Sequence, residues 1–270
     1  MTMRFSLEGK TAIVTGAAGI LGSRICKGLS EFGANIAVVD IDIQASESLA
    51  VELNKVTASK AISVQCDVSD TESVSQMTSR VVDVFGGIDV LVNNAASKSD
   101  DLNAFFAPFE EYSLEEWRKV MSVNIDGMFL VAQSVGTQMV KQGRGGSIIQ
   151  TSSIYGLSAP DQRIYEGSSY LGRQINTPAV YTTSKAAVIG LTNHLATYWA
   201  DKGIRVNTIS PGGMESGQNE EFMRNYSNRV PMNRMGTPDE IVGAVIYLAS
   251  DASSYVTGQN TVIDGGLTCW

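Results

Sequence analysis

Short apolar runs alternate with helix-like patterns from one end of this 270-residue chain to the other. The runs lack the regular polar positions of a strand with one face in water, so we interpret them as strands buried on both faces of a parallel sheet. Strands that alternate with helices predict an α/β fold, a doubly wound parallel sheet with helices on both faces. The expected strands cover residues 11–15, 36–40, 61–65, 90–93, 147–150, 205–209 and 259–263.

Three capping signals indicate where helices begin. Ser69 with Glu72, and Ser113 with Glu116, have the three-residue spacing of a capping box. Thr237-Pro238 adds a proline at the first helical position, where the missing N–H costs little. These signals predict that a helix begins directly after each of the three capping residues.

One region, residues 154–180, breaks the alternation. It contains glycine, proline and polar residues with little periodicity. A loop of this length inside a compact domain is usually functional or disordered. We therefore expect a single domain over residues 1–270, with an inserted loop at about 154–180 beside the functional site.

The composition argues against several classes of protein. With 43% hydrophobic residues the chain can bury one sizeable core, yet it has neither an apolar run long enough to span a membrane nor a signal-peptide pattern. A net charge of −8 without a basic cluster argues against a nucleic-acid partner. Three widely spaced cysteines argue against a disulfide framework or a metal site and favour a cytoplasmic protein.

The first expected strand leads directly into a glycine-rich turn, Thr-Gly-Ala-Ala-Gly-Ile-Leu-Gly over residues 15–22, and a helical pattern follows. Glycines allow the backbone to approach a pyrophosphate, whose charge the helix N-terminus then stabilises. An ordinary strand-to-helix turn is the alternative interpretation. The position between a first strand and a first helix favours a Rossmann-type dinucleotide site.

An acidic residue, Asp40, ends the second expected strand, 24 residues after Gly16. A carboxylate at this place accepts hydrogen bonds from the adenosine ribose hydroxyls and repels a 2′-phosphate. Neither arginine nor lysine occurs at positions 17, 18, 41 or 42 to bind that phosphate. We therefore expect the cofactor NAD rather than NADP.

Eight short motifs, taken together and in order, resemble the classical short-chain dehydrogenase/reductase family. They are the glycine turn, Cys66-Asp67-Val68, Asn93-Asn94-Ala95-Ala96, Val123-Asn124-Ile125-Asp126-Gly127, Ser152-Ser153, Tyr181-Thr-Thr-Ser-Lys185, Ser210-Pro211-Gly212 and Asp264-Gly265-Gly266. The resemblance extends from Lys10 to Gly266. It implies an enzyme that moves a hydride between a nicotinamide cofactor and an alcohol or carbonyl carbon.

The expected catalytic residues begin with Tyr181 and Lys185, which are four apart on a helix and share one face. An ammonium group beside a phenol favours phenolate, which lowers the tyrosine pKa toward the working pH of a general acid–base. The resemblance implies that Tyr181 transfers the proton and that Ser153, rather than Ser152, binds the substrate oxygen. It also implies that Lys185 holds the nicotinamide ribose and that Asn124 supports a water relay to this lysine.

The glycine turn, the strand-end carboxylate and the resemblance together give the expected cofactor contacts. They are Gly16, Gly19, Ile20, Leu21, Gly22, Asp40, Asp67, Val68, Asn93, Ala95, Tyr181, Lys185, Pro211, Gly212, Met214 and Ser216. Within this set the resemblance puts Asp67 at the adenine ring and Asn93 beside the cofactor cleft. Two positions depart from the family pattern: the middle glycine falls one position early, at Gly19, and Ser216 stands where many relatives have threonine.

The path from Ser153 to Tyr181 is 28 residues, more than the family usually places there. Since both residues must face one substrate oxygen, we expect the extra chain to form a lid at the mouth of the site. Arg163 or Arg173 would then bind a phosphate or carboxylate of a polyhydroxylated, sugar-like substrate. A solvated or subunit-contacting excursion is the alternative.

Several functions remain open at this point. Residues 153–156 and 159–163 are also similar to bacterial dehydrogenases of flagellin-glycan sugar synthesis, which suits a sugar, sugar-phosphate or sugar-acid substrate. One alternative is a 3-oxoacyl-type reductase, although the acidic stretch 100–116 would repel an acidic carrier protein; another is an NAD-using isomerase or dehydratase. The family also implies a homotetramer or dimer, with the helix of Tyr181 and its predecessor at one interface.

Overall fold

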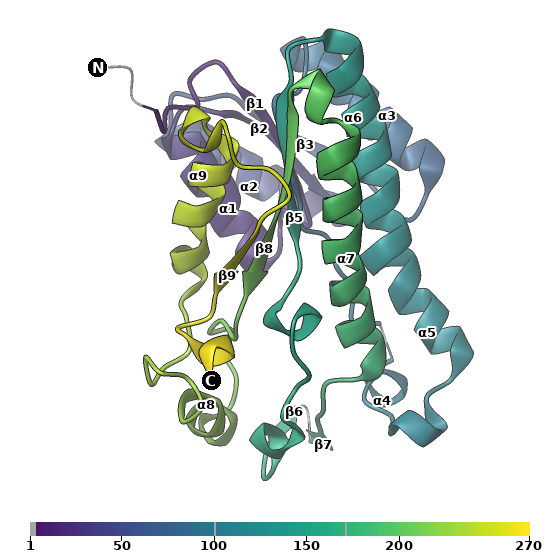
Figure 1. Ribbon diagram of the computed structural model, residues 1–270. Helices are drawn as coiled ribbons and strands as arrows, with labels where there is room; N and C mark the ends of the chain where they lie inside the picture. Colours follow the sequence, from purple (N-terminus) through teal and green to yellow (C-terminus); the bar gives the residue numbers. More distant parts are fainter. Residues whose placement is uncertain (1–3, 100, 171) are drawn as a thin grey trace.

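The computed structural model describes residues 4–99, 101–170 and 172–270 and is built around a seven-stranded parallel sheet (Figure 1). The strand order β3-β2-β1-β4-β5-β8-β9 reverses between β1 and β4, and ligands of such sheets bind at the carboxyl ends of the strands beside this reversal. The strands are β1 Thr11–Thr15, β2 Asn35–Asp40, β3 Ala61–Gln65, β4 Val90–Asn93, β5 Gly146–Thr151, β8 Ile204–Pro211 and β9 Asn260–Ile263. The predicted doubly wound sheet is confirmed, with every strand end within two residues.

Helices cover both faces of the sheet, α1, α2 and α9 on one and α3, α6 and α7 on the other (Figure 1). The helices are α1 Ile20–Glu31, α2 Ile43–Val56, α3 Thr71–Phe85, α4 Leu102–Phe105, α5 Leu114–Met121, α6 Met128–Gln142, α7 Ala179–Tyr198, α8 Glu220–Ser227 and α9 Val242–Ala249. Among the described residues, no helix is both long and apolar enough to cross a membrane. The same part of the chain holds no group of three or more metal-ligating side chains that could bind an ion.

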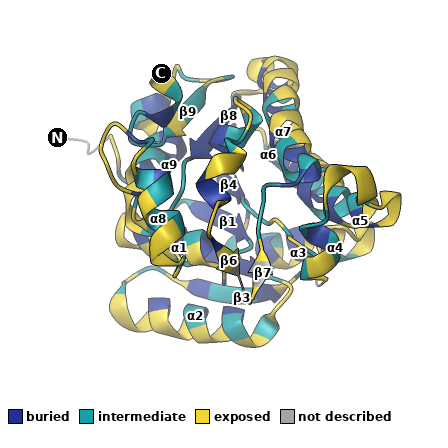
Figure 2. Cartoon of the chain, turned by 90° about the horizontal axis from the view of Figure 1, so that it is seen from below, coloured by how far each residue is buried: buried dark blue, intermediate teal, exposed yellow. Residues whose placement is uncertain are grey.

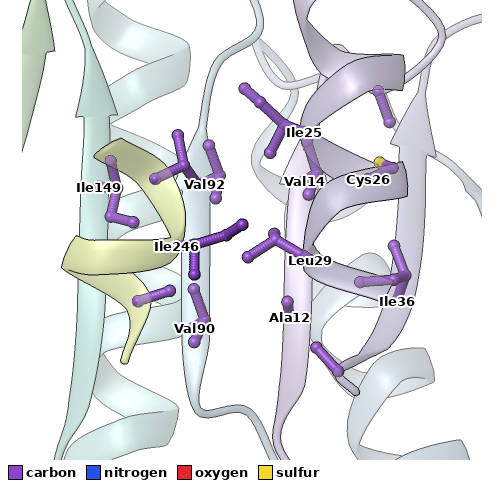
Figure 3. Close-up of a cluster of buried hydrophobic side chains, with 14 of the residues drawn as sticks. Ala12, Val14, Ile25, Cys26, Leu29, Ile36, Val90, Val92, Ile149 and Ile246 are labelled. Carbon is purple, nitrogen blue, oxygen red and sulfur yellow. The ribbon is translucent and has the colours of Figure 1, made fainter. Parts of the chain in front are cut away.

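Each face of the sheet has its own apolar core. On the face of α1 and α9, Val14 and Val92 from the sheet meet Leu29 and Ile246 from the helices, all of them buried (Figure 3). Helices α3, α6 and α7 pack in the same way on the opposite face. Figure 2 shows buried strands enclosed by helices whose outer sides are exposed. Burial from both sides explains why the strands are unbroken apolar runs.

Two of the three predicted helix starts are confirmed. Ser113 accepts a hydrogen bond from the Glu116 N–H, 3.1 Å away, and Glu240 accepts one from the Thr237 N–H at 2.8 Å. The prediction for α3 is wrong by one residue, because Asp70 caps the helix by accepting from the Ser73 N–H at 2.7 Å. The Ser69 hydroxyl instead donates to the Asp67 carboxylate.

The inserted segment 154–180 has more structure than its sequence indicates. It contains short 3₁₀ turns at Ile154–Gly156 and Gln162–Tyr165 and a two-stranded antiparallel ribbon, β6 Ser169–Tyr170 and β7 Arg173–Gln174. Ile164 and Tyr165 are buried in a small apolar cluster with residues of α8. These elements are too short to produce a period in the sequence. Both views place the ribbon beyond the carboxyl end of the sheet, where α8 also lies (Figures 1 and 2).

Candidate active site

The glycine turn lies at the carboxyl end of β1, beside the reversal of strand order. Gly16 has φ +62°, a conformation that L side chains rarely adopt. A methyl group at Gly22 would overlap the Gly16 carbonyl oxygen, so only glycine allows α1 to start this close to the turn. Gly19 caps α1 without a side-chain hydrogen bond, which leaves the first N–H groups of the helix free for an anion. This cradle fits a dinucleotide pyrophosphate.

Hydrogen bonds of Thr15 join the carboxyl ends of β1 and β4. Its hydroxyl accepts from the N–H groups of Asn94 and Ala95, at 2.9 and 3.1 Å, and donates to the Asn93 side chain at 3.3 Å. The side-chain amide of Asn94 donates a hydrogen bond to the Thr15 carbonyl oxygen, 3.2 Å away. The sequence prediction missed Thr15, although a threonine directly before the first glycine was a usable signal. Ala95 does lie at the turn, because a methyl group on Gly16 would come within 2.9 Å of the Ala95 Cα.

Asn93 differs from its predicted place. Its side chain is buried, and its amide donates to the Met128 carbonyl at 2.8 Å while its oxygen accepts from Thr15. Both ends of the amide therefore bind within the protein. Asn93 lies beneath the cofactor cleft and supports it, rather than lining it. Leu21 likewise packs against the apolar core, behind the turn.

The two acidic residues predicted at the adenosine end both lie at carboxyl ends of strands. Asp40 accepts a hydrogen bond from the Ala18 N–H of the glycine turn at 2.9 Å, so its carboxylate lies directly beside the turn. Asp67 is exposed, and one of its oxygens accepts from the N–H and hydroxyl of Ser69. Val68 packs closely on Gly127, where a methyl group would come within 2.8 Å of the valine. Asp40 is thus the carboxylate nearest the turn.

The residues that follow β8 face the glycine turn across a hollow of about 550 Å³. Its lining includes Gly19, Ile20 and Ser216, three of the residues that we expect to contact the cofactor. The Ser216 hydroxyl accepts a hydrogen bond from the Gln218 amide at 2.8 Å and retains its own proton to donate. β8 ends at Pro211. Of the residues that follow it, Gly212 packs against Asp264, and Met214 forms an isolated β-bridge with Gly236.

The expected catalytic residues meet where β5 passes the N-terminal half of α7. The Ser153 hydroxyl lies near the Tyr181 hydroxyl, close enough to lower the pKa of the tyrosine. Lys185 is buried, and its Nζ donates to the Thr151 carbonyl at 3.0 Å. Ser152, the competing serine, donates to the Lys185 carbonyl at 2.6 Å and is therefore committed to packing α7 on β5. The serine that faces the tyrosine is Ser153.

The pKa values of the pair differ from the sequence expectation. Burial raises the pKa of Tyr181, and the nearby Ser153 hydroxyl offsets only part of that rise. The Lys185 ammonium lies 5.9 Å from the centre of the tyrosine ring and donates its hydrogen bond to Thr151 rather than to the phenol. Burial also lowers the pKa of Lys185, to about 8. The surroundings therefore disfavour both charged forms.

Asn124 lies in a π-helical turn, Ser122–Gly127, between α5 and α6. π-Turns interrupt the regular hydrogen-bond ladder and are frequent at functional sites. The side chain is fully buried: its oxygen accepts from the Ser97 N–H at 2.8 Å and its amide donates to the Ser184 hydroxyl at 3.4 Å. Ser184 in turn donates to the Tyr181 carbonyl at 2.8 Å. Asn124 thus joins the loop after β4 to the helix that carries the tyrosine.

Comparison with known proteins identifies the family. A family model described as enoyl-(acyl carrier protein) reductase matches residues 16–268. The chain belongs to the classical short-chain dehydrogenase/reductase family. These enzymes are dehydrogenases and reductases that act on alcohol and carbonyl groups and bind a nicotinamide cofactor.

Two relatives of this short-chain dehydrogenase/reductase are matched over nearly their whole length. A D-threitol dehydrogenase from Mycolicibacterium smegmatis is 36% identical, over 98% of this chain and 95% of the relative. A 3-oxoacyl-[acyl-carrier-protein] reductase from Thermotoga maritima is 37% identical, over 97% of this chain and 98% of the relative.

Two solved structures of the family show the same fold. A gluconate 5-dehydrogenase from Burkholderia cenocepacia, in complex with NADP and tartrate, superposes with a TM-score of 0.87 at 32% identity, over 99% of this chain and 98% of that one. A short-chain dehydrogenase from Leptospira borgpetersenii with bound NAD+ gives 0.83 at 32% identity, over 99% and 96%. The neighbours thus include both nicotinamide cofactors.

The two arginines predicted to bind an anionic substrate have different outcomes. The Arg163 guanidinium donates two hydrogen bonds to Asp161, at 2.8 and 2.7 Å, and its side chain is 81% exposed. This pairing, together with Arg229, lowers the pKa of Asp161 to about 2. Arg163 is therefore paired in this structure, and its expected contact with an anionic substrate stays a prediction. The side chain of Arg173 lies outside the described part of the structure.

The glycine turn gives a testable prediction for this dehydrogenase/reductase. We expect Gly22→Ala to weaken cofactor binding and lower stability, because the added methyl group overlaps the Gly16 carbonyl, and such overpacking costs about 1–3 kcal/mol. Gly19→Ala is the matched control: its methyl group would lie 3.3 Å from the same oxygen. Cofactor fluorescence titration and thermal unfolding measure both effects. Equal losses in the two variants would contradict this account of the turn.

Proposed function

We propose that this enzyme is an NAD-dependent dehydrogenase that interconverts a secondary alcohol and a carbonyl on a polyhydroxylated, sugar-like substrate. The observation that carries the proposal is the placement of Ser153 next to Tyr181, beside the buried Lys185. Threitol and gluconate occur in the names of similar enzymes and support a sugar-like substrate. The free cysteines Cys26, Cys66 and Cys269 suit a reducing compartment, so we also propose a cytoplasmic location.

In the proposed alcohol oxidation, the Ser153 hydroxyl holds the substrate oxygen and Tyr181, as phenolate, accepts the hydroxyl proton. The bound nicotinamide supplies the hydride-accepting chemistry. Lys185 would hold the nicotinamide ribose, and Asn124 would support the path by which the proton leaves. In the reverse direction the Tyr181 phenol donates its proton to the carbonyl oxygen.

The pH dependence follows from the raised pKa of Tyr181, which keeps its proton to higher pH than an ordinary tyrosine. We expect kcat/KM for alcohol oxidation to rise with pH, because phenolate is the active form. For carbonyl reduction we expect kcat/KM to fall at alkaline pH, because the phenol is then lost. Tyr181→Phe should lower kcat by about 10²- to 10⁴-fold in both directions. An unchanged pH profile in this variant would exclude Tyr181 as the proton carrier.

The preference for NAD is argued from Asp40, whose carboxylate lies beside the glycine turn. We expect Asp40→Asn to lower the ratio of kcat/KM for NAD to that for NADP by at least about tenfold, about 1.4 kcal/mol, because the isosteric amide no longer repels a 2′-phosphate. Asp42→Asn is the control, since Asp42 caps α2 by accepting from the Ala45 N–H and an asparagine can do the same. A preference of the wild-type enzyme for NADP would overturn the proposal.

The alternative reactions can be separated in one assay. A 3-oxoacyl-type reductase would have to dock an acidic carrier protein, but the segment before and within α5 exposes Glu110, Glu111 and Glu115. An isomerase or dehydratase that regenerates its cofactor causes no net absorbance change at the NADH band. A dehydrogenase changes this absorbance in proportion to turnover.

We also propose a homo-oligomer that pairs α6 and α7 with the same helices of another copy. Phe129 and Val140 of α6 and Tyr198 of α7 are exposed, and they line one apolar groove of about 420 Å³. We expect light scattering to give a multiple of 28.9 kDa for the wild type and a smaller mass for Phe129→Asp, because burying the new charge is costly. Phe109→Asp, at an exposed phenylalanine outside this groove, is the control. A monomeric wild type would refute the assembly.

A further inference from the structure

A chain of three hydroxyl groups lies beside the catalytic tyrosine. Tyr165 is hydrogen-bonded to the Thr177 hydroxyl on one side, and the Tyr155 hydroxyl on the other side is near enough to affect its pKa. Burial raises the pKa of Tyr155, so this hydroxyl stays protonated at all working pH values. Tyr165 also adds to the raised pKa of Tyr181, which reflects the closeness of the two phenols.

Both ends of this row of hydroxyl groups, Tyr155 and Thr177, are connected to the catalytic residues through backbone groups. The Tyr155 N–H donates to the Ser153 hydroxyl at 3.2 Å. Thr177 directly precedes Pro178, whose carbonyl accepts the Tyr181 N–H at 3.1 Å. The hydroxyl chain therefore runs from the serine side of the site to the tyrosine side.

The inserted segment holds Tyr165 firmly in this place. On the α7 side, the Gln162 side chain hydrogen-bonds the carbonyl and the N–H of Thr177, at 3.1 and 3.4 Å. On the α8 side, Tyr165 stacks on Phe222 with ring centres 5.5 Å apart, and Asn225 donates to the Glu166 carbonyl at 3.2 Å. The segment thus joins the catalytic helix to α8 and forms a fixed wall.

Two arginines share one carboxylate at this wall. Among the side chains of residues 154–180 that the structure describes, Arg163 is the only cation, and it is paired with Asp161. Arg229, which follows α8, lies 3.2 Å from the same carboxylate. The side chains of the hydroxyl chain itself, Tyr155, Tyr165 and Thr177, are neutral.

We propose that Tyr165, with Tyr155, determines substrate specificity by hydrogen-bonding the hydroxyl groups of an uncharged polyol or sugar. The inference rests on the proposed dehydrogenase function and narrows its substrate class to neutral polyhydroxylated compounds. Each phenol can donate one hydrogen bond and accept others, which matches a substrate hydroxyl. A compound that lacks this hydroxyl loses the hydrogen bond to the phenol, so the site selects against it.

The test compares two kinds of alcohol with the full-length enzyme and NAD. The assay follows NADH formation with neutral polyols (threitol, xylitol, sorbitol), with gluconate as an acidic analogue, and with 2-butanol as a secondary alcohol without further hydroxyls. Tyr165→Phe and Tyr155→Phe keep the ring and remove only the hydroxyl. Tyr255→Phe, at a fully exposed tyrosine, is the control. Thermal unfolding verifies that each variant folds.

We expect wild-type kcat/KM to be highest for a neutral polyol. In Tyr165→Phe the ratio of kcat/KM for the polyol to that for 2-butanol should fall about 5- to 100-fold, mainly through KM, with a smaller fall in Tyr155→Phe. A preference for gluconate, or an unchanged ratio in both variants, overturns the inference and leaves the dehydrogenase function standing. A wild-type enzyme that forms no NADH from any of these alcohols contradicts the proposed function itself.

Discussion

The hydroxyl of Thr15 determines the spacing of β1 and β4 at the point where the strand order reverses. It binds the backbone of Asn94 and Ala95 and the side chain of Asn93, so a single side chain closes the cleft floor between two strands. The glycine turn begins at the next residue, and its Ala18 N–H binds Asp40 from β2. Three neighbouring strands are therefore tied together at their carboxyl ends. The dinucleotide site depends on this frame because the turn itself contains no side chain that could hold it open.

The catalytic pair depends on a second close contact, between β5 and α7. Ser152 donates to the Lys185 carbonyl while the Lys185 ammonium donates to Thr151, so each element binds the other. Gly156 allows this approach, since a methyl group there would come within 2.6 Å of the Lys185 carbonyl oxygen. The same burial raises the pKa of Tyr181 and lowers that of Lys185. Because desolvation disfavours both charges, the nearby Ser153 hydroxyl is the group that favours the phenolate.

The strands and the catalytic set could be predicted because periodicity and short motifs are properties of neighbouring residues. The cap of α3 could not be predicted, since Ser69 and Asp70 are adjacent and both are good caps, and only the structure shows that Asp70 accepts from Ser73 while Ser69 donates to Asp67. The motif that contains Asn93 also could not indicate that both ends of the Asn93 side-chain amide form hydrogen bonds within the protein. The sequence also did not reveal the wall that Tyr165 forms with Thr177 and Phe222. These two partners lie 12 and 57 positions further along the chain, and no sequence periodicity connects them with Tyr165.

Length alone would make the inserted segment a flexible lid, but its contacts have the opposite effect. It is bound to the start of α7, the helix that carries Tyr181, and to α8. Chain entropy is therefore lost when the protein folds rather than when it binds, which is the condition for a preorganised pocket. A preorganised row of hydroxyls discriminates by the positions of its hydrogen-bonding groups, whereas an arginine would attract any anion over a longer range. In the proposed specificity, selection at this wall falls to the geometry of hydroxyl groups, since the Arg163 guanidinium donates to Asp161.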